Sequence, residues 1–465
     1  MAMKFVLGLV APLFVGASVA LAGSVPIAPV GSEFQVNTYT PDNQYQSGRA
    51  ICTDAAGNFV VVWQSGSFLA PIDADGDMAG IFGRRYASNG GAVGTEFQVN
   101  SFTVGSQTDP TVCCQPDGDF IVAWTINGPV LTFFDHIDAQ RFASTGAPVG
   151  TEFQVTSYTT DFGFNADICC AETGDFVVVW DAFYGYSDFR IKGQRFDSAA
   201  MRQGAEFQVN TYTSTFAFDP GVCCDTAGNF VVAWSEVRSS FPFDSDVFGR
   251  RYASDGTTLG TEYQVNTYTA YFQGQAVPES DYGSVENQAV SCSPAGDFTV
   301  AWTSETYEYA EIRAQRFASD GSFAGTEFQV NRYTDGYQGS PAVCHDADGS
   351  FIVVWTSEVL PGSNNAFVDG RRFAVNGAPG SFDFQVNTYT SGSMYFPTLT
   401  CGPDHGFVVS WSQFPDEDGN QAGVFAQRFE RIDVTQTPAL SWVGLASGLA
   451  ALLGVAGSAL RRRRR

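Results

Sequence analysis

A five-residue block, Glu-Phe-Gln-Val-Asn, recurs along most of this chain of 465 residues. It begins at Glu33, Glu96, Glu152, Glu206, Glu262, Glu327 and Asp383, and Thr156 and Tyr263 are variants within it. Successive blocks are 54 to 65 residues apart, and three other segments recur between them. These are an apolar stretch ending in Cys, a stretch such as Gly57 to Trp63, and a stretch such as Gly193 to Phe196. Repetition at a near-constant spacing indicates that each unit has the same local fold.

Each recurring segment has the length and the Val, Phe and Ile content of a β strand and is bounded by Gly, Asp or Asn. In chain order we name them strand A (ending in Cys), strand B (ending in Trp), strand C (Gln-Arg-Phe) and strand D (the block). Turns such as Ser254-Asp255-Gly256 between C and D suit hairpins. Seven four-stranded antiparallel units predict an all-β fold, a seven-bladed β-propeller. An open string of small β domains is the alternative.

The two ends of the repeat region favour a closed ring. The chain starts with a lone D strand, Glu33 to Asn37, and ends with A, B and C strands near Cys401, Trp411 and Phe429. Seven D strands and seven A-B-C triplets match only if the first D strand completes the last sheet. Such closure removes the free sheet edges that would otherwise aggregate.

The ten cysteines test the ring because all lie at two adjacent positions near the end of A strands. Adjacent strand residues point to opposite faces, and the two faces of a blade look at its two neighbours. If the first position of each blade faces the second position of the next, every cysteine is paired. The predicted disulfides are Cys52–Cys114, Cys113–Cys170, Cys169–Cys224, Cys223–Cys292 and Cys344–Cys401. Five interblade disulfides would place the protein outside the cytoplasm. Unpaired buried thiols, or thiols at a metal or catalytic site, are the alternatives.

Composition at the two termini predicts export and a membrane-spanning tail. Residues 1–22 combine Lys4, an apolar run and Ala20-Leu21-Ala22, which is typical of a cleaved signal peptide; an uncleaved anchor is the alternative. The propeller is expected over 23–432 and a linker over 433–438. Residues 439–460 carry no charge and are long enough to span a bilayer as a helix. The arginines of 461–465 would stay on the cytoplasmic side.

The tail resembles the C-terminal sorting signals of Gram-negative bacteria of the PEP-CTERM and IPTL-CTERM families. The resemblance covers about 30 residues: the segment Thr437-Pro438-Ala439-Leu440-Ser441-Trp442, the apolar stretch and the terminal arginines. It implies that a transpeptidase-like membrane enzyme cuts the tail and transfers the protein to the cell surface. A permanent single-span anchor is the other interpretation.

Charge excludes one class of partner. Of the 24 Lys and Arg, one lies in the first 22 residues and five form the last five, so 18 oppose 49 Asp and Glu in between. A nucleic-acid binder needs clustered cations. We therefore expect no nucleic-acid partner.

The D–A and B–C connections vary in length and are rich in aromatic residues. Because A–B and C–D turns are short and uniform, the variable connections should share one face, the variable-loop face, where a ligand would bind. Its candidate residues are Tyr45, Phe162, Phe164, Phe216, Phe218, Tyr271, Phe272, Tyr282, Tyr307, Tyr309, Tyr337, Tyr395 and Phe396. Exposed aromatics beside carboxylates suit a surface glycan or a protein ligand. Alternatively, the rings fold back and cap the blades.

Two B–C loops carry spaced acidic residues around a glycine. They contain Asp73, Asp75 and Asp77 in one loop, and Asp416, Asp418 and Asn420 in the other. Alternating oxygen ligands around a turn suit a hard cation, so calcium is a candidate cofactor. Solvated acidic loops are the alternative.

The sequence contains no phosphate-binding glycine loop, no His-Glu-x-x-His and no nucleophile elbow. We therefore expect a non-enzymatic binding or structural module at the cell surface, acting in adhesion, matrix attachment or polysaccharide binding. The alternative is a carbohydrate-active enzyme, a glycoside hydrolase or lyase. Loop carboxylates such as Glu305 or Glu308 with Asp281 could act in it, although no sequence feature selects such a pair. Acids from different blades that converge near the axis with raised pKa would favour the enzyme.

Overall fold

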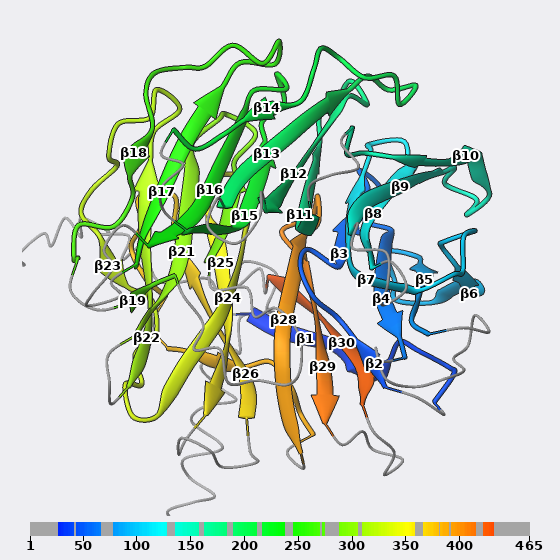
Figure 1. The fold of residues 1–465 in the computed structure, drawn as a ribbon. Coiled ribbons are helices and arrows are strands. Elements are labelled where there is room, and N and C mark those ends of the chain that lie inside the picture. Colours follow the sequence, from blue (N-terminus) through cyan, green and yellow to red (C-terminus); the bar gives the residue numbers. More distant parts are fainter. Residues whose placement is uncertain are drawn as a thin grey trace, which may run out of the picture.

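The computed structural model describes residues 27–40, 43–66, 78–127, 135–157, 162–183, 189–211, 216–237, 245–269, 272–274, 288–305, 309–358, 366–380, 382–389, 392–414 and 422–431. The regular elements of these residues are thirty β strands. They form seven antiparallel blades around a central axis (Figure 1). The predicted seven-bladed propeller of four-stranded blades is thereby confirmed.

The strands of blades 1 to 4 follow the predicted A-B-C-D order. In blade 1, strand A is divided into β2 (Gln44–Tyr45) and β3 (Ile51–Thr53), which both pair with β4 (Phe59–Ser65). The blade continues with β5 (Gly80–Tyr86) and β6 (Ala92–Gln98). Blade 2 contains β7 (Ser106–Cys114), β8 (Phe120–Asn127), β9 (His136–Phe142) and β10 (Pro148–Gln154). Blade 3 contains β11 (Phe162–Cys170), β12 (Phe176–Phe183), β13 (Phe189–Phe196) and β14 (Phe207–Gln208). Blade 4 contains β15 (Phe216–Cys224), β16 (Phe230–Val237), β17 (Ser245–Tyr252) and β18 (Tyr263–Gln264).

Blades 5 to 7 complete the ring. Blade 5 contains β19 (Phe272–Gln273), β20 (Gln288–Cys292), β21 (Phe298–Glu305), β22 (Ala310–Phe317) and β23 (Phe328–Gln329). Blade 6 contains β24 (Tyr337–His345), β25 (Phe351–Glu358), β26 (Ala366–Phe373) and β27 (Phe384–Gln385). Blade 7 contains β28 (Ser393–Cys401), β29 (Phe407–Phe414), β30 (Gly423–Arg431) and the N-terminal β1 (Ile27–Gln35). The short β19 pairs with β17 and β21 and so joins blades 4 and 5 into one sheet.

The hydrophobic core lies between blades. The B strands are buried on both faces, and their tryptophans are among the largest fully buried side chains. In one cluster, Val60 and Val62 of β4 pack with Phe120 and Trp124 of β8. Strands buried on both sides read as continuous apolar runs, which explains the Phe-Val-Val-Val-Trp pattern.

The recurring Glu and Asn of the D-strand block have structural roles. The Glu carboxylate accepts a backbone N–H from the preceding blade, as Glu96 does from Thr38 at 2.8 Å and Glu152 from Ser101 at 2.6 Å. The Asn side chain accepts the N–H of a residue in the adjoining C strand, as Asn100 does from Ile81. The block therefore recurs because it joins strand to strand and blade to blade.

The C-strand arginines also link blades. Arg85 donates to the carbonyl of Ser144 in the next blade, and Arg428 donates to that of Asn89. In blade 6, Arg372 instead donates to the buried carboxylate of Asp346. Neighbouring blades are thus connected at their outer edges as well as through their cores.

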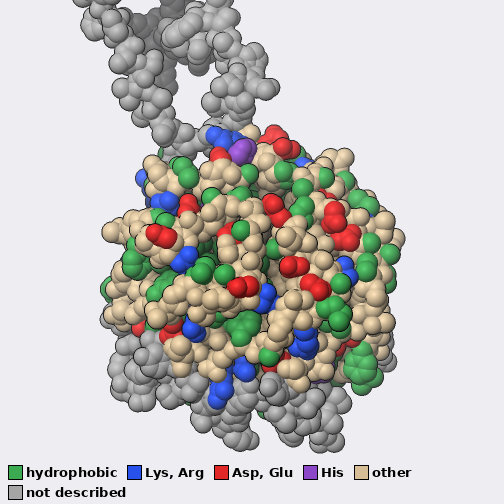
Figure 2. Space-filling model, turned by 90° about the horizontal axis from the view of Figure 1, so that it is seen from above, with side chains coloured by type: hydrophobic (Ala, Val, Ile, Leu, Met, Phe, Trp, Pro, Cys, Tyr) green, Lys and Arg blue, Asp and Glu red, His purple; other side chains and the backbone are tan. Residues whose placement is uncertain are grey.

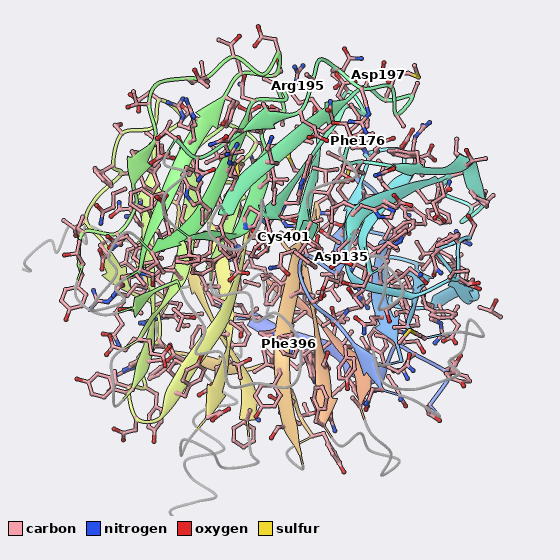
Figure 3. The ribbon with its side chains drawn as sticks, viewed as in Figure 1. Asp135, Phe176, Arg195, Asp197, Phe396 and Cys401 are labelled. Atoms are coloured by element: carbon pink, nitrogen blue, oxygen red, sulfur yellow. A yellow bond between two sulfur atoms is a disulfide. The ribbon has the colours of Figure 1, made fainter. Side chains whose placement is uncertain are left out.

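The ring closes through β1. This strand pairs with β30 from Ile27↔Arg431 to Gln35↔Phe425, as Figure 1 shows for the blue and orange-red strands. The five disulfides present are Cys52–Cys114, Cys113–Cys170, Cys169–Cys224, Cys223–Cys292 and Cys344–Cys401, the pairs expected from the sequence. All ten cysteines are used, so none is a free thiol. In Figure 3, Cys401 lies at the middle of the ring, whereas Arg195 and Asp197 lie at its edge.

Residues 1–26 and 432–465 lie outside the described residues, and so do the predicted signal peptide, linker, membrane helix and arginine tail. Within the described part of the chain, no helix is long and apolar enough to cross a membrane. The disulfides are consistent with export into an oxidising compartment.

Candidate functional site

The predicted aromatic face is largely self-packed where its side chains are described. Phe164 packs on Phe183, and Phe189 packs on both Phe183 and Phe216. Near blades 7 and 1, Tyr45 stacks on Phe414, which also contacts Tyr395, and Tyr395 contacts Phe396. Phe162 stacks on Phe164, and Phe218 and Tyr337 are half-buried. Exposed rings remain at Phe216 and Tyr309, with 43% and 47% of their surface accessible. Capping of the blades therefore accounts for most of these residues.

Several predicted residues cannot be placed in this way. Tyr271, Tyr282, Tyr307, Glu308 and Asp281 lie outside the described residues, and Phe272 is described only as part of the backbone of β19. The calcium candidates Asp73, Asp75, Asp77, Asp416, Asp418 and Asn420 also lie outside them.

Two glutamates at the variable-loop end of neighbouring blades, Glu305 and Glu358, both act electrostatically on one tyrosine, Tyr337, and raise its pKa. Glu305 is the last residue of β21 in blade 5, and Glu358 is the last residue of β25 in blade 6. Tyr337, the first residue of β24, pairs in register with Glu358. Tyr395 of blade 7 donates its hydroxyl proton to Glu358 Oε1 at 3.2 Å. Three blades therefore contribute to this mouth cluster of Glu305, Tyr337, Glu358 and Tyr395.

The electrostatics of the mouth cluster suit proton transfer. Burial raises the pKa of Glu305 to about 7. One of its carboxyl oxygens, Oε2, is buried and accepts no hydrogen bond within the described structure. Burial also raises the pKa of the Tyr337 phenol, and the charges of Glu305 and Glu358 raise it further. A carboxyl group with a pKa near neutrality can donate or accept a proton at physiological pH.

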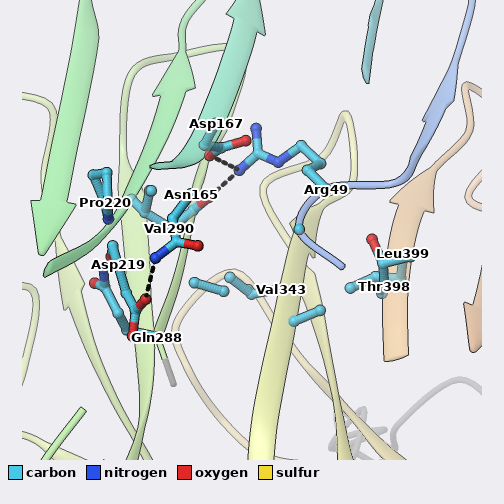
Figure 4. Close-up of a pocket in the computed structure, with 14 residues that line it drawn as sticks. Arg49, Asn165, Asp167, Asp219, Pro220, Gln288, Val290, Val343, Thr398 and Leu399 are labelled. Carbon is cyan, nitrogen blue, oxygen red and sulfur yellow. Dashed lines mark hydrogen bonds and ion pairs between the residues drawn. The ribbon is translucent and has the colours of Figure 1, made fainter. Parts of the chain in front are cut away.

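Below the mouth, polar side chains from other blades line the axial channel. Asp167, Asn165, Asp219 and Gln288 face Arg49 across a cavity of about 40 Å³ (Figure 4). Arg49 lies 3.9 Å from Asp167 and donates a 2.7 Å hydrogen bond to the carbonyl of Val290. This cavity has room for a few water molecules or one ion, but it is far smaller than usual organic-ligand pockets. The cavity is therefore too small for a sugar chain.

Bulges in the A strands turn the channel residues inward. The register of β7, β11, β15, β24 and β28 shifts near the middle of each strand. At each shift one non-glycine residue has a left-handed backbone, at Asp109, Asn165, Asp219, Ser340 and Phe396. Bulges of this kind re-aim a side chain beside a functional site.

The sequence suggests Glu305 as a candidate carboxylate but indicates neither its partner Glu358 nor the acids of the channel. A usable signal was the residue three positions after the B-strand Trp. That residue is Glu only in blades 5 and 6, and Gly, Asn, Phe or Val elsewhere. Similarly, the residue four positions before the first cysteine position is Asp in blades 2 and 4. Departures from a repeat at fixed positions therefore indicate the functional candidates.

A third cluster lies at the A–B turns of blades 6 and 7. Asp346, Asp348 and His405 could together ligate a metal, since their ligand atoms lie within 4.8 Å of one another. Arg372 already pairs with Asp346, and Arg431 lies 3.2 Å from Asp348. The two arginines balance the two carboxylates, so we interpret the cluster as an ion-pair network between blades.

The face of the molecule drawn in Figure 2 carries no continuous stripe of basic side chains among the described residues. On the face shown in Figure 2, arginine and lysine side chains are scattered singly among acidic ones.

Comparison with known proteins supports the fold. No family model matches the chain, and no curated protein sequence does either. A crystal structure of a protein of unknown function from Dyadobacter fermentans DSM 18053 is similar over 87% of this chain and 99% of its own, with 9% identity and a TM-score of 0.50. The polysaccharide lyase Uly1 is similar over 87% of this chain and all of its own, with 11% identity and a TM-score of 0.50. A fungal α-L-arabinofuranosidase from Fusarium graminearum gives 11% identity and a TM-score of 0.46 over 69% of this chain and 91% of its own.

These findings correct the expectation that the chain is not an enzyme. A solved protein that shares the propeller fold is a polysaccharide lyase, so a regular propeller does not argue against catalysis. In addition, acids from neighbouring blades converge at the mouth, and one has its pKa raised to about 7. That arrangement is the feature that separates the enzymatic interpretation from the non-enzymatic one.

Proposed function

We propose that the protein is a carbohydrate-active enzyme that hydrolyses glycosidic bonds at the mouth cluster. The observation that carries this proposal is the convergence of Glu305 and Glu358 on Tyr337, with the pKa of Glu305 at about 7. Glycoside hydrolysis uses two carboxyl groups on opposite sides of the scissile bond. One of them must hold a proton near neutral pH, and the other must be ionised.

Glu305 is the proposed general acid. Its pKa of about 7 leaves a large share of the side chain protonated at neutral pH, and no group in the described structure donates a hydrogen bond to its buried Oε2. Protonation of that oxygen lowers the barrier to cleavage of the bond. Glu358 is the proposed second carboxylate, and the hydroxyl of Tyr395 orients it through the 3.2 Å hydrogen bond.

Aromatic side chains would hold the sugar. Tyr309 lies four residues after Glu305, just before β22, and is exposed. An exposed aromatic ring offers an apolar face for stacking next to the polar groups that contact hydroxyls. The surface glycan predicted from the sequence would then be a substrate and not only a ligand.

The test is release of reducing ends from a panel of neutral and uronate-containing polysaccharides by the purified propeller, residues 23–432. We expect cleavage of at least one polysaccharide, with products that lack the unsaturated-uronate absorbance of a lyase reaction. Unsaturated products would indicate that the enzyme cleaves the chain by elimination rather than by hydrolysis. No cleavage of any polysaccharide, with or without added calcium, would count against the proposed activity.

We also propose that residues 1–22 are removed on export and that 439–460 anchor or sort the protein at the cell envelope. The disulfides support export, since they need an oxidising compartment. Mass spectrometry of the mature protein from its own cells should find a start at residue 23. A C-terminus ahead of Ala439 would indicate a cleaved tail, and an intact Arg465 would indicate a permanent anchor.

A further inference from the structure

The axial channel contains a surplus of buried acids that the proposed hydrolysis does not use. Asp167 is satisfied: its carboxylate accepts the backbone N–H groups of Ile168 and Val222 at 2.8 and 2.7 Å and lies beside Arg49. Asp181 and Asp219 are different. Among the described residues, no Lys, Arg or His forms an ion pair with either of them.

These two acids lie close together on neighbouring blades. The amide Nδ2 of Asn165 donates to Asp181 Oδ2 at 2.8 Å and to Asp219 Oδ1 at 3.3 Å. Burial and the nearby charges of Asp181 and Asp109 raise the pKa of Asp219 well above its usual range. Burial raises the pKa of Asp181 to about 8. Arg49 lines the same cavity but is paired with Asp167, so Asp181 and Asp219 must hold protons or repel each other.

Two oxygen atoms near the pair have no hydrogen-bond donor. Asp181 Oδ1 and Gln288 Oε1 are buried and unpartnered, and their residues are only 1% and 4% exposed. Gln288 lines the 40 Å³ cavity together with Asp219 and Asn165 (Figure 4). Buried polar atoms without a partner cost free energy, so these two call for a partner such as an ordered water molecule or an ion.

We propose that this cavity binds one hard divalent cation of the calcium class. Asp219 and Gln288 line the cavity and would supply oxygen ligands. Asp181 does not line it, but it is linked to Asp219 through Asn165 and would supply a further oxygen from the edge of the site. The carboxamide of Asn165, when rotated by half a turn, would add its oxygen. Water molecules in the cavity would complete the shell. The donors are all oxygens, with no Cys and no His, which suits calcium rather than zinc.

A cation here would join blades 3, 4 and 5 at the axis. Asp181 belongs to β12, Asp219 to β15 and Gln288 to β20. This site is separate from the two acidic B–C loops, which the sequence also predicts as calcium candidates. The experiment must therefore separate the two locations.

The test is calcium binding by the chelator-treated propeller, measured by isothermal titration calorimetry and thermal unfolding. The variants are Asp219→Asn, Asp181→Asn, a loop variant with Asp75→Asn and Asp418→Asn, and the exposed control Asp404→Asn. We expect the wild type to bind calcium and to unfold at a higher temperature when it is bound. Each channel variant should lose one equivalent of calcium, or weaken its binding at least tenfold, while the loop variant and the control keep that equivalent.

The channel variants should also differ from the wild type in unfolding temperature, in opposite directions without and with calcium. Without calcium, Asp219→Asn and Asp181→Asn should unfold at a higher temperature than the wild type, because each removes a repelling buried acid. With calcium the order should reverse. Equal calcium binding by the wild type and both channel variants would overturn the proposal, and so would a wild type that binds no calcium. Loss of binding only in the loop variant would assign the ion to the B–C loops instead.

Discussion

Replacing Glu305 by Gln should lower kcat/KM for the cleaved polysaccharide by about 10²- to 10⁴-fold, the usual contribution of a general acid. Glutamine keeps the shape of the side chain but has no proton to transfer. The loss should appear in kcat rather than KM, since contacts to the sugar remain. The measurement is the initial rate of reducing-end release over a range of substrate concentrations.

The pH dependence gives this prediction a second readout. Glu305 acts in its protonated form, and its pKa is about 7. The wild-type rate should therefore fall as the pH rises above about 7, and the residual rate of Glu305→Gln should no longer fall in this range.

The stability of the folded protein should also depend on the protonation of Glu305. Because burial raises this pKa above its ordinary value, the folded protein binds the proton more tightly than the unfolded chain. The contribution of Glu305 to stability thus declines between about pH 4.5 and 7, and the Gln variant should not show this decline.

The matched control is Glu430→Gln, which makes the same change at an exposed position on β30. It should leave the rate and its pH profile unchanged. A Glu305→Gln protein that is folded, has wild-type unfolding behaviour and retains more than half of the wild-type rate would exclude Glu305 as the acid.

The ring could be predicted from the sequence because its rules are local. Strand pleat alternates side chains between faces, so the two cysteine positions of an A strand must look at different neighbours. One pairing rule then joins Cys52 to Cys114 and repeats around the ring. Closure followed from counting strands: seven D strands match seven A-B-C triplets only if the first D strand completes the last blade, and β1 does pair with β30.

The mouth cluster could not be predicted because its residues meet only through the geometry of the ring. Glu305 and Glu358 are 53 positions apart and lie at the ends of different B strands. Their approach depends on how closely the inner strands converge, which no local pattern encodes. The channel acids depend further on A-strand bulges such as that near Asp219, where the register shifts between Phe218 and Gly221. The packing of the candidate aromatic residues is not encoded by a local pattern either, since Phe162 stacks on Phe164 and Tyr45 stacks on Phe414.

Deleting residues 27–37 should destabilise the propeller by about 5 kcal/mol or more, an amount comparable with the whole stability of many domains. The deletion removes Val36, which is fully buried between blades 7 and 1, together with Phe34. It also removes Glu33, whose carboxylate accepts the backbone N–H of Thr388 at 2.6 Å. Asn37 is lost as well, and with it the 2.8 Å bond from Val424 N–H. Thermal unfolding and size-exclusion chromatography should show an early transition and soluble aggregates.

Aggregation is expected because the deletion leaves β30 as an open sheet edge with an apolar face. A circular permutant that carries residues 27–37 after Arg431, joined through a short turn sequence because Ile27 pairs with Arg431, restores the same hydrogen bonds from the other end of the chain. It should recover the wild-type transition, since closure depends on the presence of the strand and not on its position in the sequence. A synthetic peptide of residues 27–40, added in excess to the deletion protein, should also raise its unfolding temperature in proportion to the logarithm of peptide concentration. The five disulfides would remain in every variant, but none of them joins blade 7 to blade 1. A deletion protein as stable and monomeric as the wild type would therefore mean that β1 is not needed to close the ring.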